Sequence, residues 1–208
     1  MHERTLKHPL LRNPNEVVAL GPDWALVTLD KDAAAGTLAE VLEGAMDRPS
    51  GRVLLLAPTG SRIVAAGLHM ANGIVLSRDG RTAFVAEMVG RRLAVFDRSP
   101  EREAWTLRTR VPLPAGPDNL TLADDGRVLA AAHPKLLTLA FGYQRSERRL
   151  SPSMILAYEP SSGRVRTLLS SDGREIAGGS VAAPTGQAGT LLIGSAFGPH
   201  ILRCRGVA

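Results

Sequence analysis

The apolar and polar positions repeat four times along the chain. Each repeat opens with a polar or glycine-rich stretch, continues as a short alternating apolar run, and turns through Gly or Asp into a second apolar run. The openings are residues 13–16, 71–73, 117–119 and 178–180. Counted from Asn15, Asn72, Asn119 and Ser180, they lie 57, 47 and 61 residues apart. Repeats of this length, built from short strands and hairpin turns, predict an all-β protein of the β-propeller class with about four blades.

The same pattern predicts a single domain over residues 1–208 with one short inserted helix. The helix is expected within 38–46, where apolar residues recur at helical spacing. A strand over 62–66 is expected to open the second unit, and a strand over 105–111 to form its outer edge. The apolar run 136–139 is expected to continue the third unit.

Composition narrows the class of protein. Only 4% of the 208 residues are aromatic, so the core must be built from aliphatic side chains. No apolar run approaches the roughly 18 residues of a membrane helix, and residues 1–11 contain no signal-peptide segment, which favours a cytoplasmic protein without membrane insertion. The net charge is +5, but the arginines are scattered among 20 acidic residues and do not alternate with aromatics, so nucleic acid is not the expected partner.

The openings carry the candidate chemistry. Three of the four contain Asn or Asp, at Asn15, Asn72, Asp118 and Asn119. A propeller gathers the starts of its innermost strands around one central channel, and neutral and acidic oxygens are the ligands that calcium prefers. Ordinary turn chemistry explains each Asn taken singly, because Asn favours loops and tolerates left-handed backbone. Both interpretations stay open at this level.

Several of these stretches, in the same order, resemble one known family. They are residues 7–22, 72–74 with 77–80, 118–120 with Asp125, His133 with Pro134, 179–182, 191–194 and 202–204. The chain resembles the serum paraoxonase/arylesterase family, within the wider regucalcin/gluconolactonase-like group. The resemblance implies a six-bladed propeller with two calcium ions in its tunnel, of which this chain matches the C-terminal two-thirds. It therefore also implies that the chain is incomplete at its N-terminal end.

The resemblance further implies a ligand set. Asn15, Asn72, Asp118 and Asn119 match ligands of the catalytic calcium. Glu16 stands where the family usually has an Asp that binds the structural calcium, so it keeps the carboxylate but lengthens the side chain. His133 matches a residue of the pocket wall, although a buried histidine bonded to the backbone explains it nearly as well.

The function that follows is a calcium-dependent hydrolase of carboxylic esters or lactones, in which the metal polarises the carbonyl for attack by water. Its partner would be a small-molecule ester or lactone. The alternative is a non-catalytic propeller that binds a ligand or a protein. That alternative is motivated by the family's acidic ligand pair and proposed general-base histidines, whose positions would precede Met1. No catalytic base is assigned in this chain.

Overall fold

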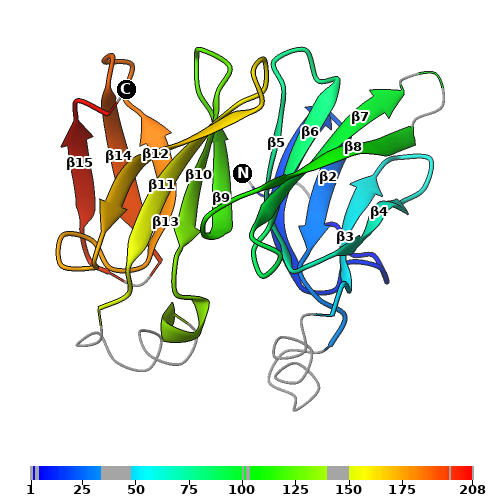
Figure 1. The fold of residues 1–208 in the computed structure, drawn as a ribbon. Helices are drawn as coiled ribbons and strands as arrows, with labels where there is room; N and C mark the ends of the chain where they lie inside the picture. Colours follow the sequence, from blue (N-terminus) through cyan, green and yellow to red (C-terminus); the bar gives the residue numbers. More distant parts are fainter. Residues whose placement is uncertain are drawn as a thin grey trace.

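Each of the four expected units forms its own antiparallel sheet in the computed structural model (Figure 1). The structure describes residues 2, 5–33, 48–99, 101, 104–139, 150–196 and 198–207. Within these residues the chain is almost entirely strand and turn, which confirms the all-β class and the four-blade propeller arrangement. No described helix is long and apolar enough to cross a bilayer.

Three sheets have four strands and the last has three, and in every sheet the strands follow one another in chain order. The first sheet consists of β1 (Pro14–Gly21), β2 (Trp24–Leu29), β3 (Gly51–Leu56) and β4 (Arg62–Leu68). The second consists of β5 (Ala71–Leu76), β6 (Thr82–Glu87), β7 (Arg92–Ser99) and β8 (Ala104–Pro112). The third consists of β9 (Gly116–Leu122), β10 (Val128–His133), β11 (Ser153–Glu159) and β12 (Arg164–Ser171). The last consists of β13 (Gly179–Pro184), β14 (Thr190–Ser195) and β15 (Ile201–Arg205).

One assignment made from the sequence is wrong. The strand expected to open the second unit is β4, which is the outer strand of the first sheet and pairs with β3. The run 136–139, expected to continue the third unit, forms a short helical turn after β10. The outer strand expected over 105–111 is confirmed as part of β8. The helix expected within 38–46 lies outside the described residues.

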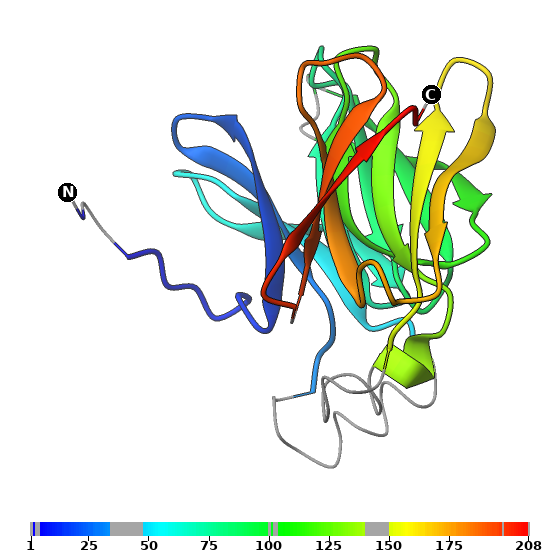
Figure 2. The same ribbon diagram turned by 90° about the vertical axis from the view of Figure 1, so that its left-hand side faces the viewer.

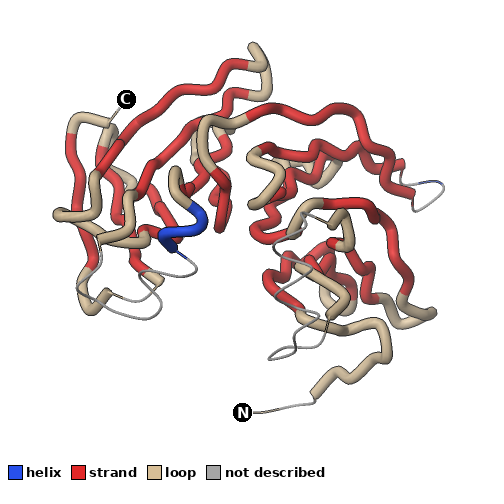
Figure 3. Tube along the Cα trace, turned by 60° about the horizontal axis from the view of Figure 1, so that its bottom comes forward, coloured by secondary structure: helices blue, strands red, loops and turns tan. Residues whose placement is uncertain are grey.

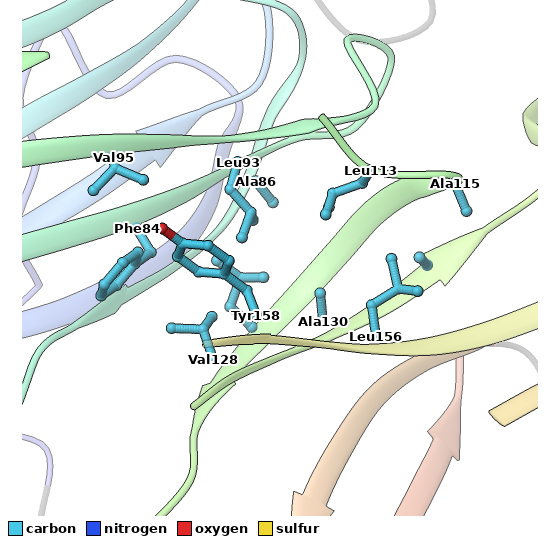
Figure 4. Packing of buried hydrophobic residues seen from close by; sticks show 12 residues of the cluster. Phe84, Ala86, Leu93, Val95, Leu113, Ala115, Val128, Ala130, Leu156 and Tyr158 are labelled. Atoms are coloured by element: carbon cyan, nitrogen blue, oxygen red, sulfur yellow. The ribbon is translucent and has the colours of Figure 1, made fainter. Parts of the chain in front are cut away.

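Buried residues on both faces hold the sheets together. Along β6, Phe84 and Ala86 pack against the third sheet, whereas Ala83 and Val85 pack against the first, as the two-residue period of a strand requires. Figure 4 shows the core between the second and third sheets, where the rings of Phe84 and Tyr158 meet edge to face with centroids 6.1 Å apart. Burying each large apolar side chain contributes roughly 1.5–3 kcal/mol, so these shared faces fix how neighbouring blades are placed.

The four sheets follow one another along an arc (Figure 3). The first strand of each sheet, called here the inner strand, lies beside the inner strand of the next sheet, in the order β1, β5, β9, β13. All four inner strands begin at the end where the helical turn 136–139 lies, which is the lower end in Figure 1. The segment before β1 runs outside the sheets (Figure 2), and its Leu10 and Leu11 pack against Val27 and Leu29.

Candidate metal centre at the starts of the inner strands

The starts of the inner strands share a backbone irregularity. In β1, β5 and β9, two residues stand opposite one residue of the partner strand, and in β13 one residue is inserted. The bulged residues are Asn15 and Glu16, Asn72 and Gly73, Asp118 and Asn119, and Ser180. A β-bulge breaks the regular alternation of side chains and re-aims them, and bulges are frequent beside active sites. Every residue predicted from the sequence to be a metal ligand therefore lies in a bulge.

Hydrogen bonding supports the first bulge. Thr28 is the single residue opposite Asn15 and Glu16, and its side chain is fully buried. The Glu16 amide donates to Thr28 Oγ1 at 3.0 Å, so a side-chain oxygen replaces the missing ladder partner. The Glu16 carboxylate is then free to reach the neighbouring sheet, where its Oε2 accepts a 2.9 Å hydrogen bond from the Ile74 amide.

Further contacts join the remaining starts. A Cβ added to Gly73 would lie 2.6 Å from both the Asp118 carbonyl oxygen and the Leu120 amide nitrogen, so the backbones of β5 and β9 touch where only glycine fits. The Asn119 side-chain amide donates to the Ser180 carbonyl at 2.9 Å, which links β9 to β13. The four inner strands are thus connected in series at the end that holds the candidate ligands.

Two carboxyl groups, those of Glu16 and Asp118, interact electrostatically in this region. Burial raises the pKa of Glu16 above its ordinary value, the bond from Ile74 opposes this, and the negative charge of Asp118 raises the pKa further. Asp118 Oδ2 lies 3.0 Å from Nε2 of His133, which is fully buried. Nδ1 of His133 has no hydrogen-bond partner among the described residues. With a proton on Nε2, His133 would donate to Asp118 and fix the orientation of that carboxylate.

Asn72 supplies the observation that points to a cation. The residue is 4% exposed, and its Oδ1 is buried without a hydrogen-bond partner among the described residues. Its Nδ2 donates to the Met88 sulfur at 3.8 Å. A buried acceptor without a donor is costly, as is burying a carboxylate near a second negative charge, and a hard cation relieves both. No group of three His, Cys, Asp or Glu side chains gathers for a metal in the described part of the chain, so a site here depends on amide oxygens.

The remaining candidates occupy different positions. Asn15 lies in the first bulge with an exposed side chain. His133 contacts Asp118 from within the core of the third sheet, so it does not line an open surface. Ser180, which sequence analysis did not select, occupies the fourth bulge and is nearly buried. The position of Ser180 in the 178–180 opening is the sequence feature that could have indicated a role in the site, but serine at such a position is equally typical of a turn.

An apolar cluster adjoins the candidate ligands at the same end. Met88, Leu139 and Ala177 are buried in it, with Met70 and Leu136 packed around them. Met88 connects the cluster to Asn72 through the sulfur contact. These side chains come from segments just outside β5, β6, β10 and β13, so three sheets contribute to one apolar wall beside the polar centre.

Comparison with known proteins places the chain in a family. Residues 1–205 match the sequence profile of the family described as Arylesterase. The chain belongs to the arylesterase family. It is 31% identical to serum paraoxonase/lactonase 3 of Oryctolagus cuniculus over 201 residues and 29% identical to serum paraoxonase/arylesterase 2 of Bos taurus over 201 residues. Each alignment covers 95% of this chain and 55% of the relative, so the chain spans about half the length of these relatives.

Solved structures agree on the fold of this arylesterase-family chain. A putative gluconolactonase superposes with a TM-score of 0.55 at 17% identity, over 88% of this chain and 55% of that protein. A luciferin-regenerating enzyme superposes with a TM-score of 0.56 at 14% identity, over 90% of this chain and 56% of that protein. At these identities the likeness concerns the fold alone.

Proposed function

We propose that the chain carries the metal and substrate centre of a calcium-dependent carboxylic ester or lactone hydrolase. The observation that supports this most directly is the set of bulges that brings Glu16, Asn72 and Asp118 to one end of the inner strands. The relatives' names, paraoxonase/lactonase and paraoxonase/arylesterase, agree with that chemistry.

The oxygen donors fit calcium better than a softer metal. Carboxylates of Glu16 and Asp118 and the side-chain oxygens of Asn72, Asn119 and Asn15 are all hard ligands, and calcium takes 6–8 of them. A cation bound here would give the unpartnered Asn72 oxygen a partner and would oppose the rise in the pKa of Glu16, so both observations support a cation site. When bound, calcium would supply a Lewis acid that polarises a substrate carbonyl.

The chain's own residues would orient and shield the substrate. His133 holds the Asp118 carboxylate through the 3.0 Å contact. The apolar cluster of Met70, Met88, Leu136, Leu139 and Ala177 excludes water from one side of the centre and offers a surface to the apolar part of an ester or lactone.

One observation favours the alternative of a ligand-binding propeller without catalysis. His133 is 0% exposed, so its ring acts on Asp118 and does not reach a water molecule in an open site. A chain that binds calcium and an ester analogue yet turns over no ester would match this second function.

Calorimetric calcium titration combined with an aryl acetate hydrolysis assay tests the proposal. We expect calcium binding, hydrolysis that ends when a chelator has removed the metal, and recovery on adding calcium back. Hydrolysis that persists after confirmed metal removal would refute the calcium-dependent mechanism. Binding without hydrolysis would select the alternative.

A further inference from the structure

Arg91 connects the second sheet to both strands that carry the His133 and Asp118 pair. It lies in the turn between β6 and β7. Its Nη2 donates to the Pro134 carbonyl at 3.0 Å, and its Nη1 approaches the Pro114 carbonyl at 3.4 Å. Pro134 directly follows His133 at the end of β10, and Pro114 precedes the start of β9 by two residues.

The backbone at Arg91 is also unusual. Its φ of 48° falls in the left-handed region, which favours Gly or Asn over a long side chain. Hydrogen bonds hold this conformation, because the Arg91 amide donates to the Met88 carbonyl at 3.3 Å and the Leu113 amide donates to the Arg91 carbonyl at 2.8 Å. The turn therefore aims the guanidinium at the neighbouring sheet at a steric cost.

Of the two carbonyls that the Arg91 guanidinium contacts, one belongs to the residue directly after His133, and the other belongs to a residue four positions before Asp118. In the β9–β10 ladder, His133 pairs with Gly116 and Ala132 pairs with Pro117, immediately before the Asp118 bulge. One guanidinium thus ties the chain just before β9 to the chain just after β10. Its planar fork of donors suits two separate carbonyls in a way that a single ammonium does not.

We propose that Arg91 is a positioning residue for the candidate metal centre, acting through the backbone on Asp118 and His133. The effect of Arg91 on metal binding rests on the proposed function, whereas its effect on the His133–Asp118 geometry is independent of that function. Among the described residues, the Arg91 guanidinium donates to backbone carbonyls and contacts no candidate ligand side chain, so its influence runs through the ends of β9 and β10.

The chain offers a matched control in Arg78. That residue comes from the β5–β6 turn of the same sheet and donates from Nη2 to the Asp124 carbonyl at 2.6 Å. Asp124 lies in the β9–β10 turn, at the opposite end of the same two strands. Arg78 and Arg91 therefore make the same kind of connection between the same two sheets, but only Arg91 makes it beside the candidate ligands.

The experiment compares Arg91→Ala, Arg91→Lys and Arg78→Ala in the full chain by thermal unfolding, calcium titration and imidazole nitrogen NMR of His133. The expected result is a similar fall in melting temperature for both alanine variants. Of the two alanine variants, only Arg91→Ala should raise the calcium Kd, by about five- to tenfold, which corresponds to the net contribution of about one hydrogen bond. Arg91→Lys, which can still donate to one carbonyl, should recover part of the affinity.

The NMR measurement keeps the inference separate from the proposed function. The His133 Nε2 resonance, assigned by its loss in His133→Gln, should move in Arg91→Ala and stay in place in Arg78→Ala, with or without metal. If the wild-type chain binds no calcium, the proposed function fails while this comparison still decides the role of Arg91. Equal effects of both alanine variants on the resonance and on Kd, or no effect of Arg91→Ala on either, would overturn the positioning role. If Arg91→Ala does not fold, Arg91→Gly, which removes the side chain and relieves the left-handed backbone, takes its place.

Discussion

Replacing Gly73 by alanine should damage the stability and the metal site together. The added Cβ would lie 2.6 Å from the Asp118 carbonyl oxygen and from the Leu120 amide nitrogen, and 2.9 Å from Asn119 Cα. All three are backbone atoms, so no side chain can rotate away. Reaching an ordinary contact of 3.4 Å requires β5 and β9 to separate by roughly 0.8 Å at this point. Overpacking of this kind costs about 1–3 kcal/mol.

For a chain of this size, that loss lowers the melting temperature by about 2–12 °C. The same displacement moves Asn72 away from Asp118, so we expect weaker calcium binding as well. Thermal unfolding in chelator measures the first effect, and calorimetric titration measures the second. Gly21→Ala is the matched control, because Gly21 ends inner strand β1, is not among the residues with positive φ, and has no atom within 4 Å of an added Cβ. If Gly73→Ala unfolds at the temperature of Gly21→Ala, the packing argument fails.

Three further changes test other parts of the structure. Glu16→Gln should raise the melting temperature in chelator at pH 7 and weaken calcium binding, because the raised pKa of Glu16 means that folding favours its protonated form. The gain in melting temperature should vanish well below pH 4.5, where Glu16 is protonated in the unfolded chain as well. An unchanged melting temperature at pH 7 would contradict this prediction. Glu87→Gln should lower the free energy of unfolding by about 3–5 kcal/mol in urea at pH 7, because it removes a buried carboxylate that accepts bonds from two arginines. Asp97→Asn, at an exposed ion pair, should lower it by at most about 1 kcal/mol. Burial acts to raise the pKa of Glu87, but the hydrogen bonds that Glu87 accepts outweigh burial and lower this pKa below its ordinary value of 4.5. The stabilisation is therefore present above pH 4.5, and the loss caused by Glu87→Gln should shrink as the pH falls through the pKa of Glu87 in the folded chain. Met70→Gly should be more stable than Met70→Ala by about 1 kcal/mol, because Met70 has a φ of 58°, which glycine adopts without strain. At most other positions alanine is the more stable of the two, so equal unfolding midpoints would count against backbone strain at Met70.

The blades could be predicted from the sequence because their signals are local. Turns such as 78–80 and 124–126 contain a glycine with positive φ and separate short apolar runs, which predicts hairpins directly. The sheet to which a strand belongs is not local information. Residues 62–66 precede Asn72 closely, so the sequence favours the second unit for them, but Gly67 and Met70, both with positive φ, turn the chain so that this strand closes the first sheet. The run 136–139 is too short for its apolar pattern to separate helix from strand.

The candidate site was predictable as a set of residues, but not as a geometry. Regular alternation would place Asn15 and Glu16 on opposite faces of β1, and likewise Asp118 and Asn119 on β9. Each pair instead lies in a bulge, and a bulge depends on how two strands register, which no single stretch of sequence encodes. The bond from Ile74 to Glu16 crosses between sheets, so it too was beyond prediction.

The end of the molecule that holds the candidate ligands combines several energetic costs. Among the described residues, the non-glycine positions with positive φ are Asn13, Met70 and Arg91, and each adjoins the start of an inner strand or reaches one. The same end contains the bulges of the inner strands, the buried Glu16 carboxyl with the charge of Asp118 acting on it, and the unpartnered Asn72 oxygen. Strained backbone and unpaired buried polar groups persist only where the surrounding structure holds them, and they concentrate at functional sites. A cation bound among these oxygens would offset the electrostatic part of that cost, so metal affinity and metal-free stability should change in opposite directions when Glu16 is neutralised.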